Sequence, residues 1–368
     1  MKNKFLSVFY HGRKVGRIAQ TADKLMAFEY ESQWLSDGFS ISPFKLPLEK
    51  RVFIAQREPF NGNFGVFNDS LPDGWGQLLI DRMLIKKGID PLSVSNIYRL
   101  AIVGRSGMGA LEYEPEERLT GNAQICDLDI LAREAREILN EKYNGSNLDD
   151  LAALGGSSGG ARPKVLIKYK NEDWIVKFRA DTDPKNIGKQ EYCYMSAAIA
   201  AGLIVPQIKL FKNKYFGVKR FDRKPSGEKV FMISAGALLD ASHRFPALDY
   251  CSLMALTMEL TRDFRETDKM FRLMCFNVFA HNRDDHCKNF SFLYDDNKWK
   301  CSPVYDLVYA QGMGGEHATA IDGEGRNPTE KNILSAAEKA GLEKNKARII
   351  LQEVKTAVNT HLEIESTP

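Results

Sequence analysis

The sequence of 368 residues has no closely spaced cysteines, no long apolar run and no strong excess of charge. No two of its six cysteines lie within four positions of each other, so a C-x-x-C zinc or redox motif is excluded. Cysteines scattered so widely are typical of reduced, packed thiols, and they predict an intracellular, cytoplasmic protein. The longest apolar stretch, near residues 195–206, is too short to cross a bilayer, so we expect no membrane contact.

Basic and acidic residues nearly balance. There are 51 Lys and Arg against 48 Asp and Glu, and a net charge of only +3 gives no reason to predict direct binding to nucleic acid. Hydrophobic residues make up 43% of the chain and charged residues 27%, which excludes a disordered or fibrous protein. The length is sufficient for two or three domains, or for one large protein of two lobes.

Two common site signatures are also absent. No G-x-G-x-x-G follows a predicted strand, which argues against a dinucleotide oxidoreductase. His281 and His286 are five residues apart, so they do not share a helix face, and no third ligand is nearby in the sequence. A zinc hydrolase is therefore disfavoured.

Hydrophobic periodicity and turn residues predict an α+β protein. The region up to about residue 120 is β-rich, with strands expected over 5–10, 15–19 and 25–30. Helices are expected over 77–87, 126–143, 191–201, 247–260, 267–280 and 332–340. Further strands are expected over 165–169, 174–178, 205–211 and 215–221, from 289 to 293 and from 299 onward. Gly202 and Thr329 are predicted helix caps.

The strongest chemical signal is Asp284-x4-Asn289, followed 17 residues later by Asp306. Phosphate transfer from Mg-ATP needs an aspartate that accepts or orients the substrate hydroxyl, and an asparagine and a second aspartate that hold the metal ions. These residue types occur here in that order and with the spacing of a protein-kinase catalytic loop. The alternative is a polar loop whose Asp and Asn only turn or cap the backbone.

Lys177 lies inside an apolar predicted strand, and Glu191 follows 14 residues later at the start of a predicted helix. In kinases such a lysine and glutamate form a pair that places the lysine on the ATP phosphates. The alternative is that Lys177 lies on a solvated strand face. The order of both residues before Asp284 favours the kinase interpretation.

The segment from Gly155 to Lys164 is rich in glycine and serine and is not a Walker A sequence. Its backbone N–H groups could surround phosphates with help from Lys164, and Ser157 and Ser158 are candidate phosphoacceptors. A flexible linker is the alternative, because composition alone favours it. A second glycine-rich segment, residues 104–109, is interpreted as a structural turn.

Taken in order, these motifs resemble the HipA family of bacterial toxin serine/threonine kinases, and the resemblance covers nearly the whole chain. The segments that carry it are FGVFNDSLPDGWG (64–76), GRSGMGAL (104–111), SSGGARPK (157–164), VKRFDR (218–223) and RDDHCKN (283–289). The resemblance implies a bilobal protein-kinase-like fold with an additional β-rich N-terminal subdomain and a mainly helical C-terminal lobe. The implied boundaries are residues 1–150, 151–245 and 246–368.

The resemblance also implies roles for individual residues, with ATP and Mg²⁺ as cofactors. Asp284 would be the catalytic base, Asn289 and Asp306 the magnesium ligands, and Ser157 the site of autophosphorylation. The residues implied in ATP binding are Lys177, Ser158, Gly159, Gly160, Lys164, Glu191, Lys219, Phe221, His286 and Lys288.

The partners implied are a protein substrate, with aminoacyl-tRNA synthetases as the family's suggestion, and a HipB-like DNA-binding antitoxin. The chain departs from the family pattern in two places: Lys219 stands where Glu is frequent, and the segment after Arg223 lacks the Gln-Glu-Asp pattern of the best-known branch. Two alternatives therefore stay open. One is a signalling or host-directed effector kinase without an antitoxin, and the other is a catalytically weak binding module.

Overall fold

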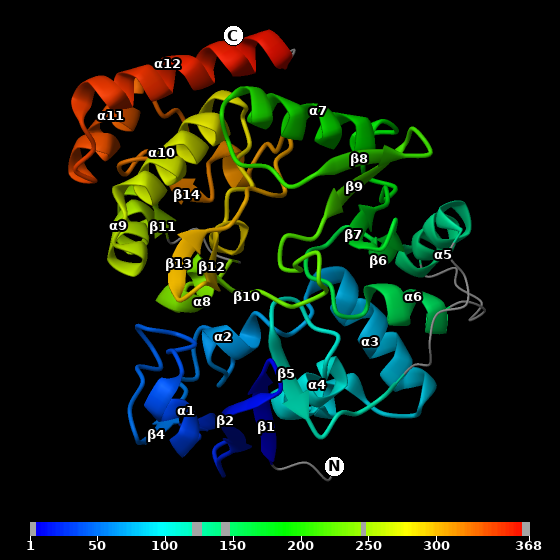
Figure 1. Ribbon diagram of the computed structural model, residues 1–368. Helices are drawn as coiled ribbons and strands as arrows, with labels where there is room; N and C mark the ends of the chain where they lie inside the picture. Colours follow the sequence, from blue (N-terminus) through cyan, green and yellow to red (C-terminus); the bar gives the residue numbers. More distant parts are fainter. Residues whose placement is uncertain (1–4, 120–126, 141–147, 244–247, 363–368) are drawn as a thin grey trace. The chain divides into compact units, whose positions relative to one another are not determined.

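The computed structural model describes residues 5–119, 127–140, 148–243 and 248–362. The chain divides into two compact units, each of which contains two segments of the sequence (Figure 1). The first unit consists of residues 1–188 and 211–231, and the second of residues 189–210 and 232–368. The predicted boundaries at residues 150 and 245 stay predictions. Among the described residues, none of the helices combines the length and the apolar character needed to cross a membrane.

The first unit begins with a five-stranded antiparallel sheet in the order β4-β3-β2-β1-β5. Its strands are β1 (Phe5–Tyr10), β2 (Arg13–Gln20), β3 (Met26–Tyr30), β4 (Val52–Ile54) and β5 (Leu111–Glu114). Side chains alternate across the sheet, so Leu6 and Val8 are buried while Phe5 is exposed. The predicted first hairpin is confirmed. The region up to about residue 120 contains helices as well as this sheet, so it is mixed and not β-rich as predicted.

Helices of the first unit lie between and after these strands. They are α1 (Ser32–Asp37), α2 (Gly65–Asn68), α3 (Gly74–Lys86), the 3₁₀ turn η1 (Pro91–Ser93), α4 (Asn96–Val103), α5 (Leu128–Leu139) and α6 (Leu148–Gly155). The helix predicted from residue 77 begins at Gly74 instead. The helix predicted over 126–143 corresponds to α5. It begins after Asp127, whose carboxylate accepts the N–H groups of Asp129 and Ile130, and residues 126 and 141–143 lie outside the described residues.

A second sheet of this unit has the order β6-β7-β9-β8. Its strands are β6 (Lys164–Tyr169), β7 (Glu172–Lys177), β9 (Tyr215–Lys219) and β8 (Ile208–Phe211), and the unit boundary falls before Phe211. The buried side chains of Trp174 and Val176 pack with Trp75 of α3 and with Leu151 of α6. The sheet therefore shares one core with α3, α5 and α6. Gly155 is predicted to lie in the glycine-rich segment 155–164 (the glycine loop). In the structure it is the last residue of α6, because Leu151 and Ala152 anchor that helix in the core.

Helices predominate in the second unit. They are α7 (Ile187–Ala200), α8 (Ala235–Leu239), α9 (Tyr250–Thr261), α10 (Phe264–Phe279), α11 (Glu330–Lys339) and α12 (Lys344–His361), and the unit boundary falls near the start of α7. Helix α10 packs against both α9 and α12 (Figure 1). The two predicted caps are confirmed. Gly202 has a positive φ of 78° directly after α7, and Thr329 forms a capping box with Asn332.

Short strands complete the second unit. A three-stranded sheet has the order β10-β12-β13, with β10 (Phe231–Ser234), β12 (Ser291–Asp295) and β13 (Lys298–Cys301). The strands β11 (Leu248–Asp249) and β14 (Thr319–Ala320) pair in parallel. The 3₁₀ turns are η2 (Cys287–Asn289) and η3 (Met313–Gly315). The strand predicted from residue 289 begins at Ser291 instead, and Asn289 lies in η2.

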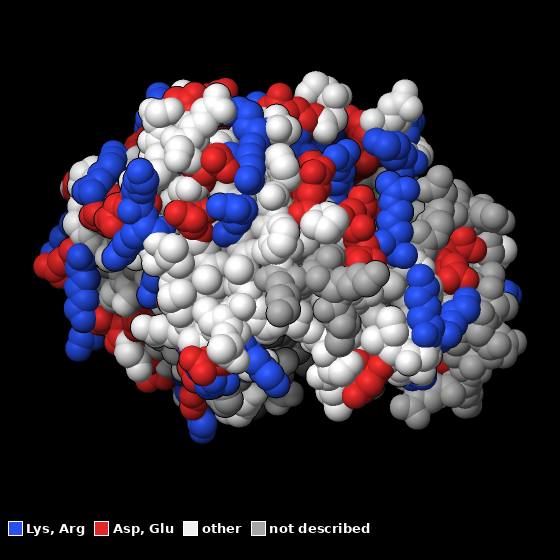
Figure 2. Space-filling model, turned by 90° about the horizontal axis from the view of Figure 1, so that it is seen from below, with Lys and Arg blue, Asp and Glu red and all other residues white. Residues whose placement is uncertain are grey.

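Basic and acidic side chains intermingle on the face drawn in Figure 2, as the near balance of 51 and 48 residues leads one to expect. Exposed ion pairs join many of the charged side chains of the described residues, for example Lys212 with Asp127 and Asp129. Because solvent screens exposed charges, each such pair contributes little to the free energy of unfolding.

Candidate active site

The loop between α10 and η2 presents Asp284 to solvent. The Asp284 side chain is 64% exposed, and its Oδ1 lies 4.0 Å from Nε2 of His286. Asn289 is turned back onto the same loop, because its Nδ2 donates a hydrogen bond of 2.6 Å to the carbonyl oxygen of Asp284. Since the amide nitrogen is used in this way, Oδ1 of Asn289 is the atom suited to a metal ion.

Tyr305 connects the neighbourhood of Asp306 to η2. The Tyr305 hydroxyl donates to the carbonyl oxygen of Lys288 at 2.6 Å and lies 2.6 Å from Oγ of Ser291. These two contacts flank Asn289 in the sequence. The structure thus brings Asp284, Asn289 and the segment that carries Asp306 into one region of the second unit.

Other predicted residues of the second unit differ in burial. Glu191 of α7 is 2% exposed, whereas His286 and Lys288 are half-buried. Burial lowers the pKa of His281 at the start of the catalytic loop, and the nearby Arg283 and His317 add to this effect. The predicted pairing of Glu191 with Lys177 stays a prediction.

The first unit holds the glycine loop. Lys164 Nζ donates to the carbonyl oxygen of Gly159 at 2.5 Å, so the lysine closes its own loop. The segment 73–76 fixes the loop from the other side. Asp73 accepts the N–H of Gly160, and Trp75 donates from its backbone to Gly160 O at 2.9 Å and from its indole to Lys164 O at 3.0 Å. Sequence reasoning missed these contacts, because they join residues more than 80 positions apart.

Ser157 and Ser158 have different environments. Ser158 is 2% exposed, and its hydroxyl donates to the carbonyl oxygen of Gly155 at 2.6 Å. Ser157 is only half-buried.

Gly76 is required by the close approach of α3 to the glycine loop. A Cβ atom at this position would lie 2.1 Å from the carbonyl oxygen of Ser158, far inside van der Waals contact. We expect Gly76→Ala to lower the free energy of unfolding by about 1–3 kcal/mol, the usual cost of overpacking. Urea unfolding measures this effect. Gly325→Ala is the control, because its nearest neighbour would be 3.6 Å away, and an equal loss in both variants would contradict the expected clash.

Lys177 and Lys164 are direct partners across β6 and β7. Lys177 Nζ lies 5.6 Å from the centre of the Phe216 ring. Lys219, at the end of β9, forms an ion pair with Glu172 on the neighbouring strand β7, and Phe221 is half-buried. The two lysines at 164 and 177 therefore lie side by side at the base of the glycine loop.

A buried ion cluster joins two of the family-like segments. Asp222 accepts hydrogen bonds from Arg220 at 2.7 and 2.8 Å, from Arg223 at 2.9 Å and from the N–H of Gly109 at 2.9 Å. Arg223 also donates to the carbonyl oxygens of Gly107 and Gly109. The segment 104–109 is thus a structural turn, as predicted, and it is attached to the end of β9. The sequence alone did not connect the two segments.

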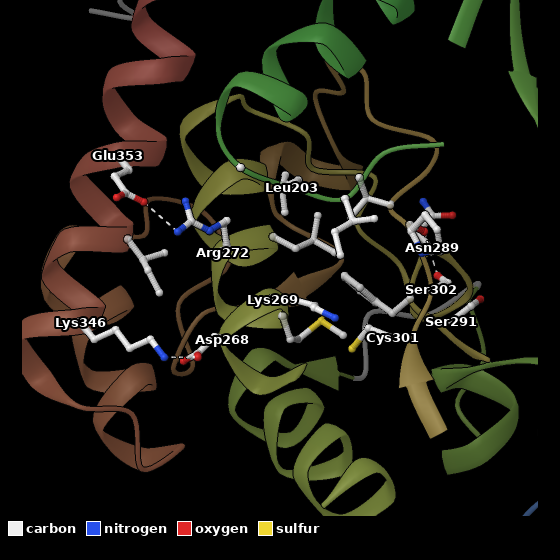
Figure 3. A pocket seen from close by; sticks show the side chains of 18 of the residues that line it. Leu203, Asp268, Lys269, Arg272, Asn289, Ser291, Cys301, Ser302, Lys346 and Glu353 are labelled. Carbon is white, nitrogen blue, oxygen red and sulfur yellow. Dashed lines mark hydrogen bonds and ion pairs between the residues drawn. The ribbon is translucent and has the colours of Figure 1, made fainter. Parts of the chain in front are cut away.

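A cavity of about 370 Å³ lies within the second unit between α10, α12 and the segments 202–204, 289–291 and 301–304 (Figure 3). Ion pairs between Arg272 and Glu353 and between Lys346 and Asp268 join α10 to α12 at its border. Of the residues predicted from the sequence, Asn289 is the one that lines it.

Comparison with known proteins identifies the family. A family model described as the HipA-like C-terminal domain matches residues 156–362, and one described as the HipA N-terminal domain matches residues 6–114. The chain belongs to the HipA-like family. The predicted resemblance is confirmed.

Relatives of this HipA-like chain are distant in sequence. "Putative kinase Y4dM" of Sinorhizobium fredii is 23% identical over 331 residues, which cover 82% of this chain and 76% of the relative. "Serine/threonine-protein kinase toxin HipA" of Shewanella oneidensis is 23% identical over 347 residues, which cover 83% of this chain and 75% of the relative. The HipA-like chain is therefore similar to proteins named as kinases.

A solved structure shares the fold. The structure of Shewanella oneidensis MR-1 HipA with HipB and its operator DNA superposes with a TM-score of 0.71 at 19% identity, over 98% of this chain and 92% of that one. The predicted α+β, HipA-like fold is confirmed.

Proposed function

We propose that this protein is an ATP- and Mg²⁺-dependent serine/threonine protein kinase that acts as the toxin of a HipA-type toxin–antitoxin pair. The observation that carries the proposal is the catalytic loop of the second unit. An exposed Asp284 carboxylate stands there beside Asn289, whose amide nitrogen is held by the Asp284 carbonyl. Membership in a family with relatives named as kinases supports it.

The lysines of the first unit support the binding of ATP. Lys164 and Lys177 are direct cross-strand partners, so two positive charges lie on neighbouring strands at the base of the glycine loop. The polyphosphate of ATP carries the opposite charge. We propose that Lys177 and the loop residues Ser158, Gly159, Gly160 and Lys164 bind the phosphates, with Glu191, Lys219, Phe221, His286 and Lys288 as further ATP-site residues.

The oxygen atoms of Asn289 and Asp306 fit a magnesium ion, which prefers oxygen ligands and keeps several waters. Among the described residues, no three His, Cys, Asp or Glu side chains gather into a metal site. The protein would thus supply few ligands, and substrate phosphates and water would supply the rest. A bound magnesium ion neutralises charge that develops on the phosphates during transfer.

The chain's own residues would then carry out the remaining steps. Asp284 accepts the proton of a serine or threonine hydroxyl as that oxygen forms a bond to the γ-phosphorus of ATP. The bond from the γ-phosphorus to the bridging oxygen breaks, and ADP leaves. Lys177 and Lys164 hold the phosphates and balance their charge. Because Asp284 is exposed, a protein substrate can reach it.

Ser157 is the proposed site of autophosphorylation. Its half-buried position makes it more accessible than Ser158, whose buried hydroxyl already donates to Gly155. A phosphate on Ser157 would add about 1.5 to 2 negative charges to the loop that binds the ATP phosphates. The expected consequence is weaker ATP binding and a less active kinase.

We also propose a HipB-like, DNA-binding antitoxin as partner. The Shewanella oneidensis HipA structure contains HipB and operator DNA, which supports this choice. The small net charge of +3 gives this chain no strong electrostatic attraction to DNA of its own. The proposed substrate is another protein, with an aminoacyl-tRNA synthetase as the first candidate.

Labelled ATP tests the proposal. We expect the purified protein to transfer the γ-phosphate to itself and to a protein in a cell lysate when Mg²⁺ is present, and to transfer none when EDTA removes the metal. Excess Mg²⁺ added after EDTA should restore transfer, which controls for damage to the fold. A protein that binds ATP but transfers no phosphate under any of these conditions would contradict the kinase assignment and favour a binding module.

The same assay tests Ser157. Ser157→Ala should lose the label on the kinase itself while the label on the lysate substrate is kept. Ser226→Ala, at an exposed serine of the same unit, is the control that should retain both. Undiminished self-labelling of Ser157→Ala would place the phosphate elsewhere.

A further inference from the structure

Two consecutive aspartates of the catalytic loop have opposite environments. Asp284 has a side chain that is 64% exposed, whereas Asp285 is fully buried with a relative exposure of 0%. Burial of a carboxylate is costly unless charged or hydrogen-bonding partners surround it. The proposed reaction uses only Asp284. It gives no reason why the Asp285 carboxylate is buried despite the free-energy cost of removing it from water.

Four donors converge on the Asp285 carboxylate. Oδ2 accepts from the Tyr250 hydroxyl at 2.9 Å and faces Nδ1 of His317 at 2.9 Å. Oδ1 accepts from the backbone N–H of Ala318 at 2.8 Å and of Thr319 at 3.3 Å. These four contacts occupy both oxygens of the carboxylate. A carboxylate oxygen accepts hydrogen bonds, so the Nδ1–H tautomer of His317 is the one that suits this contact.

The partners are themselves buried and oriented. His317 is 3% exposed, and Tyr250 and Thr319 are fully buried. Burial and the nearby Asp285 hold the pKa of Tyr250 well above its usual value, so the hydroxyl keeps its proton and can donate. Asn277 donates to the Tyr250 oxygen at 2.8 Å, and Asn282 donates to Asn277 Oδ1 at 2.9 Å. The network therefore runs from α9 through the end of α10 into the catalytic loop.

Backbone hydrogen bonds place the loop between two later segments of the second unit. The N–H of Arg283 donates to Ala310 O at 3.2 Å, and the N–H of Ala310 donates to His281 O at 3.1 Å. On the other side, the Thr319 hydroxyl donates to the carbonyl oxygen of Asp285 at 2.5 Å. Asp285 thus attaches the loop to a segment more than 30 residues later in the chain.

We propose that Asp285 and His317 form a positioning pair that fixes the loop so that Asp284 faces the acceptor hydroxyl. This inference rests on the kinase function proposed above and adds a second aspartate to it. Neither residue touches the substrate. Their effect is geometric, since a misplacement of only about 1 Å at a reacting group can cost about 10²-fold in rate.

Steady-state kinetics with the lysate substrate and ATP test the pair. His317→Leu removes the donor to Asp285, and we expect kcat to fall by about tenfold or more while KM for ATP stays within about twofold. His317→Asn places an amide N–H near the position of Nδ1 and should retain most of kcat. Tyr250→Phe removes one of the four donors and should produce a smaller fall.

A control separates positioning from stability. Val354 is a fully buried residue of α12, so Val354→Ala should lower the melting temperature of the second unit without lowering kcat. Equal losses of kcat in His317→Leu and Val354→Ala at equal losses of melting temperature would overturn the inference. So would a folded His317→Leu with the kcat of the wild type. If His317→Leu does not fold, the kcat values of Tyr250→Phe and His317→Asn are compared with that of the wild type and decide the same question.

The two proposals fail in different ways. A wild-type protein that transfers no phosphate overturns the kinase assignment and this inference with it. A wild-type protein that transfers phosphate, with an inactive Asp284 variant but an unaffected His317→Leu, overturns the positioning role alone.

Discussion

Asp284→Asn is expected to lower kcat for phosphate transfer by about 10²- to 10⁴-fold, the range that a general base contributes. The amide keeps the size of the side chain and can still receive a hydrogen bond, but it cannot take the hydroxyl proton. Because the Asp284 side chain is 64% exposed, the change should leave the melting temperature nearly unaltered. KM for ATP should change little, since Asp284 is assigned to the acceptor hydroxyl. Single-turnover transfer from labelled ATP, with thermal unfolding alongside, measures both effects.

A matched substitution in the same unit provides the control for Asp284. Asp296 lies in the exposed turn between β12 and β13 with a positive φ of 50°, a conformation that asparagine also tolerates. Asp296→Asn removes an equal charge and should transfer phosphate at the rate of the wild type. If Asp284→Asn retains full activity, Asp284 is not the general base.

Asp222→Ala is expected to lower the free energy of unfolding of the first unit by about 3–5 kcal/mol, the cost of removing one partner from a buried ion pair. Asp222 is 2% exposed and balances two guanidinium groups, Arg220 and Arg223, of which Arg220 is 7% exposed. Without the carboxylate, the two guanidinium groups lose the anion that is hydrogen-bonded to both, and only the more distant charge of Asp173 acts on them. Urea unfolding followed by tryptophan fluorescence should show the loss as a lower midpoint.

The exposed pair of Arg13 with Asp37 is the control for Asp222, with side chains that are 46% and 60% exposed. Asp37→Ala should cost no more than about 1 kcal/mol, because solvent screens such pairs. Similar losses in the free energy of unfolding from both variants would show that the buried Asp222 cluster stabilises the protein no more than an exposed pair does.

The pH dependence of stability provides an independent test of the same cluster. Burial alone would raise the pKa of Asp222, but Arg220 and Arg223 outweigh burial and lower it. A lowered pKa means that this contribution to stability is present above the ordinary aspartate pKa of about 3.9 and disappears as the pH falls through the lower value of the folded state. The stability difference between wild type and Asp222→Ala should therefore shrink in strong acid.

Local patterns in the sequence were sufficient for part of the helices and strands, and they supplied the candidate chemistry as a prediction. Helix caps such as Thr329 and Gly202 depend on neighbours within a few residues, and so does the spacing from Asp284 to Asn289. Asp284 and Asp285 show where this reasoning stops. They are identical and adjacent, and the partners that bury Asp285 lie far away in the sequence, Tyr250 before it and His317, Ala318 and Thr319 after it.

The glycine loop shows the same limit over a longer range. Its composition alone favoured a flexible linker over a phosphate site. The contacts that give it a fixed conformation come from Asp73 and Trp75, more than 80 positions earlier. No periodicity or spacing signals such contacts, because they depend on how the chain packs. Helix α6, which the sequence analysis missed, likewise owes its position to the shared core.

The attachment of the turn 104–109 to Arg223 has a consequence for how the family's domains should be understood. Two family models divide this chain into residues 6–114 and 156–362, yet hydrogen bonds from Arg223 to Gly107 and Gly109 cross that division. The indole of Trp75 crosses it as well, in the core beside Trp174. The N-terminal sequence domain is therefore not a separable module. A truncation that begins at residue 156 would remove part of the folding unit that contains Lys164 and Lys177.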